Sequence, residues 1–418
     1  SQIPLDGSGD LQLTRASNGT RINSAGLVEV TPWNIAEYSE DQTQWTSQNA
    51  TTVTANSTTA PNGTSTADTV TPTAVNDDHY RGIGLSSQVG ELTAFIYVKP
   101  NGYNFFDWGI YNGSSYLVRA TFDLVNLTYT FTNAGTATIE SVGNGWLKCG
   151  ISGSNASLST IDLYYRIRPT GGAGGFTGNG TSGAFIWGAQ LNIGSTAKPY
   201  FPTTDRLNVP RLTYQNGGGG CPSLLLEKQS TNVALYSEAL STSPNVVDSS
   251  TATANVYISP DGTQNAMQFT ETTANNRHGF YQYTTVSAQT YTASIFTKQT
   301  GRRYISLDSD MTGTQTASFF DLQTISVVSS GSGHTCSIQD FGNGWLRLNV
   351  TFTALSGSRF VIWCSSTNGT TNVYAGSTSF SQTFWGYQFE ASSYPTSYIP
   401  TTSTSATRVQ DACSKIGV

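Results

Sequence analysis

The sequence predicts an all-β protein of two tandem antiparallel β-sandwich (jelly-roll) domains that arose by internal duplication. Three observations support this prediction. Only 11% of the 418 residues are charged, against roughly 25% in an average globular protein, and Ser, Thr, Asn and Gly, which disfavour helix interiors, provide the polar surface instead. Short alternating apolar runs are separated by Gly and Asn clusters, as in β-sandwiches. The third observation is that much of the sequence occurs twice.

The repeat has a period of 198 to 199 residues. This is far longer than the roughly 20–50 residues of solenoid repeats, so it indicates two homologous domains. The matching segments are 34–40 with 232–238, 61–64 with 260–263, 143–147 with 342–346, 187–190 with 385–388, and 200–204 with 398–402.

Residues 1–33 precede the first repeat, and we expect them to form an N-terminal attachment segment. Short strands are predicted at 11–14 and 27–30, around a turn at 23–26 (Asn-Ser-Ala-Gly). The first residues lack the basic and apolar regions of a secretory signal, so no such signal is predicted.

The first jelly-roll domain is predicted to span residues 34–206. Its strands are expected where apolar and polar residues alternate between glycine-rich turns. These segments are 92–98, 116–122, 160–167 and 184–187.

A Gly-rich linker is predicted at 207–231, because four consecutive glycines at 217–220 give the chain its most flexible composition. The apolar segment 223–227 within it is expected to be a docked strand. The second jelly-roll domain follows at 232–402, and the C-terminal tail at 403–418. Strands of the second domain are expected at 290–296, 345–352 and 359–363.

Three motifs of the second domain resemble those of carbohydrate-binding-module-like jelly-roll domains in bacteriophage structural proteins. They are Gly-Asn-Gly-Trp at 342–345, Trp-Gly-Tyr-Gln-Phe at 385–389 and Tyr-Pro-Thr-Ser-Tyr-Ile-Pro-Thr-Thr at 394–402. The first domain departs from the last motif, with Ala-Lys-Pro-Tyr-Phe-Pro-Thr-Thr at 197–204. Further segments that resemble such proteins are 15–17, 21–23, 26–29, 209–214, 221–227 and 407–415.

The resemblance implies a non-enzymatic structural protein of a phage virion, either a tail fibre, a head fibre or a capsid decoration protein. It would assemble in the host bacterial cytoplasm and contact other capsid or tail proteins. By analogy we expect a homo-oligomer, a homotrimer, with weak adhesion to host cell-surface glycans. The alternatives are a dedicated receptor-binding or carbohydrate-binding tail protein and, third, a glycan depolymerase.

Four tryptophans recur at matched positions in the two repeats. They could be stacking platforms for sugars, or they could be residues of the structural core. The core interpretation is favoured, because duplicated domains retain their core residues. These residues are Trp146, Trp187, Trp345 and Trp385.

Aromatic residues that differ between the repeats are the candidates for ligand contact, since surfaces diverge faster than cores. They could bind a glycan or form a protein interface, where aromatic residues are also enriched. The candidates are Trp45, Tyr80, Phe105, Phe106, Trp108 and Tyr111 in the first repeat, and Tyr281, Tyr283, Tyr304, Trp363 and Tyr374 in the second.

No catalytic residue is predicted, because the sequence has no nucleophile-elbow or HExxH motif. Two carboxylate pairs, Asp77 with Asp78 and Asp308 with Asp310, are candidates for glycoside hydrolysis, and Asp308 and Asp310 would share a strand face and could have the required spacing. Such acids could instead hold a structural Ca²⁺. No other metal and no cofactor is expected.

The net charge of −6 without a basic stripe argues against nucleic acid as a partner, and no apolar run is long enough to span a membrane. Five cysteines are scattered along the chain. Cys221 and Cys413 lie in segments that could pair as neighbouring strands, so a disulfide between them is one hypothesis. The alternative is two buried thiols, which a reducing cytoplasm favours.

Overall fold

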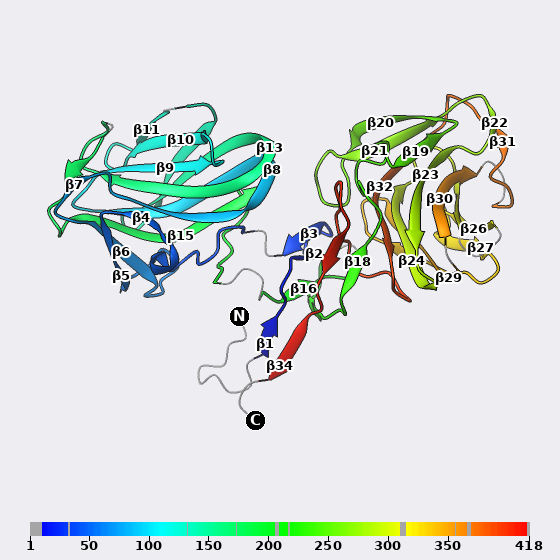
Figure 1. The fold of residues 1–418 in the computed structure, drawn as a ribbon, viewed down its shortest axis with the longest axis horizontal. Coiled ribbons are helices and arrows are strands. Elements are labelled where there is room, and N and C mark those ends of the chain that lie inside the picture. Colours follow the sequence, from blue (N-terminus) through cyan, green and yellow to red (C-terminus); the bar gives the residue numbers. More distant parts are fainter. Residues whose placement is uncertain are drawn as a thin grey trace. The chain divides into compact units, whose positions relative to one another are not determined.

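The chain, described by a computed structural model, is all-β, which confirms the predicted fold class (Figure 1). The one helical element in the described residues is the 3₁₀ helix η1 (Gln42–Gln44). Two compact units are present: one is Pro32–Val209, and the other joins the described residues up to Thr31 with those from Pro210 onward. The structure describes residues 11–31, 34–131, 133–172, 174–204, 209–215, 218–309, 315–355, 357–365 and 369–415.

The first domain is a sandwich built around two long strands, β8 (Tyr80–Asn101) and β13 (Trp146–Arg168). They pair with each other along both halves, with register shifts between Asn155 and Ile161. The other strands are β4 (Ser47–Asn49), β5 (Thr51–Thr58), β6 (Ala67–Pro72), β7 (Asn76–Asp77), β9 (Phe105–Tyr111), β10 (Tyr116–Asp123), β11 (Thr128–Phe131), β12 (Thr136–Gly143), β14 (Phe176–Thr177) and β15 (Gly183–Ile193).

The second domain has two separate sheets. One has the order β20-β21-β32-β24-β29-β28, and the other β19-β23-β30-β25-β26-β27. Their strands are β19 (Asn245–Asp248), β20 (Ser250–Tyr257), β21 (Ala266–Glu271), β23 (Gly279–Val286), β24 (Gln289–Lys298), β25 (Tyr304–Ser309), β26 (Thr316–Asp321), β27 (Ser326–Ser329), β28 (Thr335–Asp340), β29 (Trp345–Ala354), β30 (Gly357–Ser365) and β32 (Ser381–Glu390), and a small pair is β22 (Asn275–Asn276) with β31 (Tyr374–Ala375).

The two domains have the same strand order. In the first domain, the single long strand β8 corresponds to β23 and β24 of the second domain, and β13 corresponds to β29 and β30. Both long strands therefore belong to both layers. The layers have the strand orders β5-β6-β15-β8-β13-β12 and β4-β8-β13-β9-β10-β11. The four central strands of each layer have the connectivity of a two-sheet jelly roll. This correspondence is consistent with the predicted duplication.

Strict alternation of side chains places the main core of each domain between its layers. In β13, Ile161, Leu163, Tyr165 and Ile167 are buried in the core of the first domain, while the residues between them face outward. In the second domain, the core includes Phe280, Leu348 and Phe389. A second, smaller apolar cluster lies outside the main core in each domain, around Trp187 in the first and Trp385 in the second.

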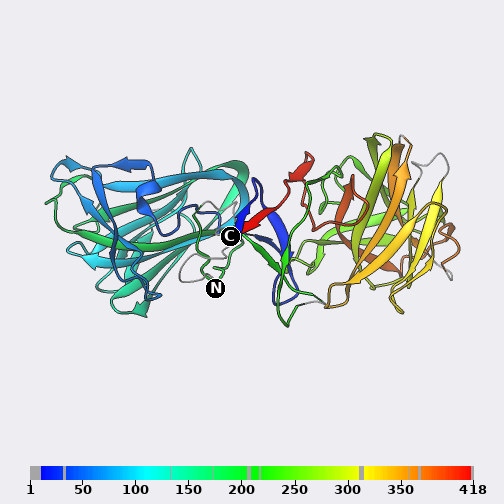
Figure 2. The same cartoon turned by 90° about the horizontal axis from the view of Figure 1, so that it is seen from below.

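The chain ends and the linker form a small β structure in the same unit as the second domain. Strand β1 (Leu11–Thr14) pairs with β34 (Ala412–Lys415), and the two run side by side in both views (Figure 1, Figure 2). The remaining pairs are β2 (Gly19–Ile22) with β3 (Val28–Thr31), β16 (Arg211–Thr213) with β17 (Ser223–Leu225), and β18 (Ser230–Asn232) with β33 (Ala406–Arg408).

A buried ion cluster holds these segments together. Asp411 accepts a hydrogen bond from Arg15 Nη1 at 2.8 Å and also pairs with Arg211. Arg211 Nη1 is 2.8 Å from Glu227 Oε2, and Arg408 Nε is 3.5 Å from the same oxygen. Residues 11–31, the linker and the tail are thus one structure, although the sequence divides them into three.

Candidate functional site

The outer face of one layer of the first domain carries the best candidate for a binding surface. This layer has the order β4-β8-β13-β9-β10. Since Phe106, Trp108 and Ile110 of β9 point into the core, the intervening Asp107, Gly109 and Tyr111 belong to the outer face.

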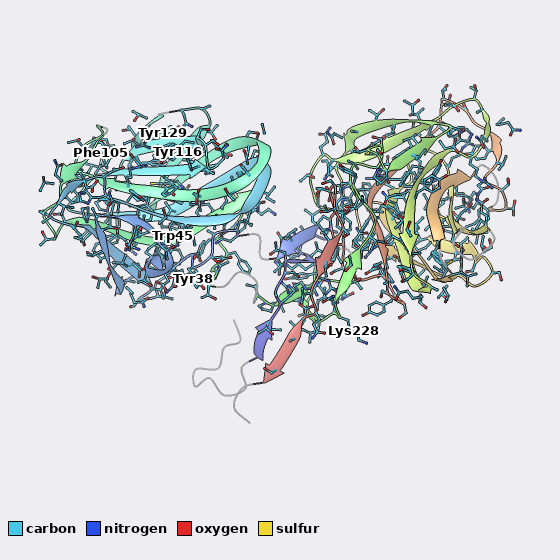
Figure 3. All side chains as sticks on the ribbon, viewed as in Figure 1. Tyr38, Trp45, Phe105, Tyr116, Tyr129 and Lys228 are labelled. Atoms are coloured by element: carbon cyan, nitrogen blue, oxygen red, sulfur yellow. The ribbon has the colours of Figure 1, made fainter. Side chains whose placement is uncertain are left out.

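Four half-buried tyrosines from four adjacent strands meet on this face: Tyr80, Tyr164, Tyr111 and Tyr116. We call them the tyrosine face. The ring centroids are 5.8 Å apart for Tyr80 and Tyr164, 6.3 Å for Tyr111 and Tyr164, and 5.3 Å for Tyr111 and Tyr116. All three contacts are edge-on, which is the favoured geometry for aromatic pairs. Tyr116 lies over strands β9 and β10 of the first domain (Figure 3).

Glycines beside the rings make room for them. Tyr164 is opposite Gly82 on one neighbouring strand and Gly109 on the other. A Cβ on Gly82 would lie 2.4 Å from Cδ1 of Tyr164, and one on Gly109 would lie 2.8 Å from Cε1 of Tyr116. The rings can therefore lie flat against the sheet only because these positions lack side chains.

Arg166 fixes the tyrosines in place. Its Nη1 donates to Tyr116 Oη at 2.9 Å and its Nε to Asp78 at 2.7 Å. The guanidinium lies 5.7 Å from the ring centroid of Tyr80, a distance typical of cation–π contacts. In addition, Ser47 Oγ donates to Tyr164 Oη at 3.1 Å. The aromatic surface is thus preorganised.

Asp162 supplies a carboxylate beside the rings. It is half-buried, opposite Tyr111 in the register, and burial raises its pKa above the ordinary value. In the described part of the chain it has no hydrogen-bond or ion-pair partner. Its oxygens can accept hydrogen bonds from hydroxyl groups of a bound molecule.

The arrangement suits a molecule with both an apolar face and hydroxyl groups. Aromatic rings provide a flat apolar surface with a polar edge, while Asp162 and the tyrosine hydroxyls provide hydrogen-bonding groups around it. A sugar ring has this combination of surfaces.

The structure brings together two of the candidates chosen from the sequence, Tyr80 and Tyr111. Phe105 lies half-buried at the opposite end of β9, where Gly171 approaches its ring. Two further members of the face, Tyr116 and Tyr164, were not among the candidates. They also differ between the repeats, so the same criterion applied to the predicted strand 160–167 would have found Tyr164.

Three first-domain candidates are corrected by the structure. Trp45, Phe106 and Trp108 are fully buried in the core, so they cannot contact a surface ligand. Trp45 stacks on Trp108 with centroids 6.4 Å apart, and Phe106 stacks on Tyr165 at 5.4 Å. They fill the space between the two layers.

Among the second-domain candidates with described side chains, Tyr281 and Tyr283 make one edge-on ring contact, with centroids 5.2 Å apart. Tyr281 is half-buried and Tyr283 is 54% exposed, and they replace Gly82 and Gly84 of the first domain. Tyr304 is half-buried under Arg303.

Of the two further candidates of the second domain, one is buried and the side chain of the other is not described. Tyr374 is corrected as well, since it is buried and its hydroxyl donates to Glu271 at 2.7 Å. The side chain of Trp363 lies outside the described residues.

The four matched tryptophans are all buried. They lie in smaller clusters apart from the main cores: Trp146 and Trp187 with Ala67, and Trp345 and Trp385 with Phe296. Their indole contacts also match, because Trp146 Nε1 donates to Thr59 O and Trp345 Nε1 to Ile258 O, both at 3.1 Å.

The carboxylates considered for catalysis or calcium are separately engaged. Asp78 pairs with Arg166 and Arg168, while Asp77 is exposed. Asp308 accepts from Asn372 at 2.7 Å, and burial raises its pKa to about 6. Its proposed companion Asp310 lies outside the described residues. Among the described residues, no three His, Cys, Asp or Glu side chains converge as a metal site.

Both cysteines considered for a disulfide are free thiols in this structure. Cys221 is exposed and Cys413 is half-buried, so they are not the buried pair expected as the alternative.

In the described residues, no helical segment has the length and hydropathy of a membrane span. No protein-family model matches the chain, and a search of curated proteins finds no match.

Proposed function

We propose that the chain is a non-enzymatic structural protein of a bacteriophage virion, of fibre or decoration type, whose first domain binds host cell-surface glycans weakly. The observation that supports the glycan part is the tyrosine face, in which Arg166 holds Tyr80 and Tyr116 and the four rings contact one another beside the unpaired carboxylate of Asp162. The virion part is supported by the motifs at 342–345, 385–389 and 394–402, which resemble those of phage structural proteins.

A homotrimer suits this function. One tyrosine face per chain would bind a sugar weakly, but several faces in a symmetric oligomer raise the overall affinity through effective concentration. A structural protein that adheres at many weak sites needs no deep pocket and no catalytic group.

A glycan array with matched variants tests the binding site. We expect the full-length protein to bind a subset of host glycans, and Tyr80→Ala or Tyr111→Ala to weaken that binding about tenfold each, because each ring supplies about 1–2 kcal/mol of stacking and burial. Asp162→Asn should also weaken binding, through loss of the charged acceptor.

The matched control is Tyr129→Ala. Tyr129 is an exposed tyrosine of β11 in the same layer, paired with the core residue Phe122, and thus on the opposite side of the sheet (Figure 3). It should leave glycan binding unchanged. Equal binding by all five proteins (the wild type and the four variants), or no binding by any, would contradict the assignment.

A further inference from the structure

The second unit contains a half-open groove that is separate from the tyrosine face. Its volume is about 490 Å³, and its walls come from the end of strand β28, the hairpin β2–β3 and the linker strands β16 and β17. Apolar side chains such as Ile338 and Phe341 line it together with Arg347.

Arg347 is a fully buried cation, with 3% of its surface exposed. Its Nη1 donates to Thr396 O at 2.7 Å and its Nη2 to Ser294 Oγ at 2.8 Å, and it lies 5.2 Å from the ring centroid of Phe296. Its Nε has no hydrogen-bond partner in the described residues. All these contacts are to neutral groups, although buried charges in proteins are normally paired with an opposite charge.

Two carboxylates, Glu390 and Glu227, attract Arg347 electrostatically, but neither forms a direct ion pair with it. Glu227 pairs with Arg211 at 2.8 Å and accepts from Ser397 Oγ at 2.6 Å. Glu390 accepts from Ser230 Oγ at 2.5 Å and from Thr396 Oγ1 at 2.6 Å. The ion cluster beside the groove contains three arginines and two carboxylates, so it does not supply a spare negative charge either.

The two domains differ in the residue opposite this cation. Lys148 of the first domain and Arg347 of the second are 199 residues apart, the repeat period. Lys148 Nζ is paired with Glu140 at 3.2 Å, directly across from it on β12. The residue directly across from Arg347 on β28 is Gln339. The second domain has therefore kept the cation and replaced its counter-ion by a neutral amide that lines the groove.

We propose that this groove binds the carboxylate of an acidic sugar residue, with Arg347 as its counter-ion. A carboxylate would accept charge-assisted hydrogen bonds from the guanidinium and neutralise it. The exposed amide of Gln339 and the carboxylate of Asp340 are placed at the groove to bind sugar hydroxyls. The ring of Phe341 offers an apolar surface for the pyranose.

Saturation-transfer NMR on the full-length protein tests this site. The probes are the methyl glycosides of glucuronic, galacturonic and sialic acid, with methyl glucoside and methyl galactoside as uncharged comparators. We expect saturable binding of at least one acidic glycoside in excess of the binding of the two uncharged ones, which can still occupy the tyrosine face. Gln339→Glu should weaken that binding about tenfold or more, because it restores the internal ion pair of the first domain and repels the ligand carboxylate.

Gln339→Glu is the decisive variant, because Gln339 is exposed and its replacement leaves the core intact. The more obvious variant, Arg347→Met, changes a buried side chain, so a loss of binding could reflect a loss of folding. Glu140→Gln, the matched change in the first domain, should leave binding of the acidic glycoside unaltered. Tyr111→Ala should weaken only the binding that the uncharged glycosides share, which separates this site from the tyrosine face. A tetraglutamate peptide serves as an acidic probe without a sugar ring. The proposal is overturned if no acidic glycoside binds, if Gln339→Glu binds as tightly as the wild type, or if only the tetraglutamate peptide binds.

Discussion

His334 is held as a neutral imidazole between two serine hydroxyls of the second domain. Its Nε2 is 2.9 Å from Ser309 Oγ, and its Nδ1 is 2.8 Å from Ser318 Oγ. Because Ser318 Oγ also accepts the Gly331 amide at 2.9 Å, its own proton is available for Nδ1. Protonation of the ring would break this arrangement, and burial lowers the pKa of His334 to about 4.

We therefore predict that His334 makes the second domain less stable in acid. The folded pKa is below the unfolded value, so the contribution of His334 is fully present above about pH 6.5 and is lost as the pH falls toward 4. The loss is on the order of 2 kcal/mol, because solvent near this loop screens part of the charge. Urea unfolding at pH 7 and pH 4.5 measures it.

The control for this prediction is His334→Asn, whose unfolding free energy should fall less over the same pH range. The comparison with the variant is needed because burial also raises the pKa of Glu238 to about 7 and of Asp308 to about 6. Those two groups retain protons in the folded state and so oppose the slope of His334. Identical slopes for the two proteins would contradict the role of His334.

Core residues explain why some single-residue predictions failed. Divergence between the repeats was used as a sign of surface, but Phe106 and Trp108 correspond to Ile305 and Leu307 at an offset of 199, and all four are buried. Cores tolerate such changes when the total volume is kept by compensating substitutions. A single sequence does not show those compensations.

The ion cluster acts at the scale of the elements, since Asp411 connects three distant segments. It binds Arg15 and Arg211, and its Oδ2 accepts the amide of Glu227 at 2.9 Å. Despite its burial, hydrogen bonds from Arg211 and Arg15 lower the pKa of Asp411 below its ordinary value. The strands β1, β16, β17 and β34 therefore depend on one carboxylate.

We predict that Asp411→Asn destabilises this structure by about 3 kcal/mol, because it leaves buried arginines without a counter-charge. Hydrogen exchange should accelerate in β1, β16 and β34, with little change in the core strands of the first domain. Glu29→Gln is the control: its pair with Arg21 is more accessible to solvent, and its loss should cost at most about 1 kcal/mol. Equal effects of the two substitutions would count against the cluster as the link between these segments.

The elements themselves were predictable wherever a period of two was clear. Segment 160–167 was predicted as a strand from its alternation, and it lies within β13. The pairing of β1 with β34 was not predictable, because these strands are about 400 residues apart and register depends on tertiary contacts rather than local pattern. The tyrosine face was missed as a unit for the same reason, since its four rings come from four strands.

At the scale of the whole molecule, the chain is a low-charge β protein with two proposed sugar sites, one in each unit. The tyrosine face and the Arg347 groove differ in chemistry: the first has a carboxylate without a partner, and the second a buried cation whose hydrogen bonds go to neutral groups. Such a protein on a particle surface would present both sites in many copies, and weak sites would then suffice for adhesion.

The most direct test of the central proposal is electron microscopy of purified virions labelled with an antibody against this chain. We predict label on the particles, either spread over the head, as for a head fibre or decoration protein, or confined to the tail, as for a tail fibre. Virions without any label, from a preparation in which the antibody detects the purified protein, would contradict the proposal that this chain is a structural protein of the virion.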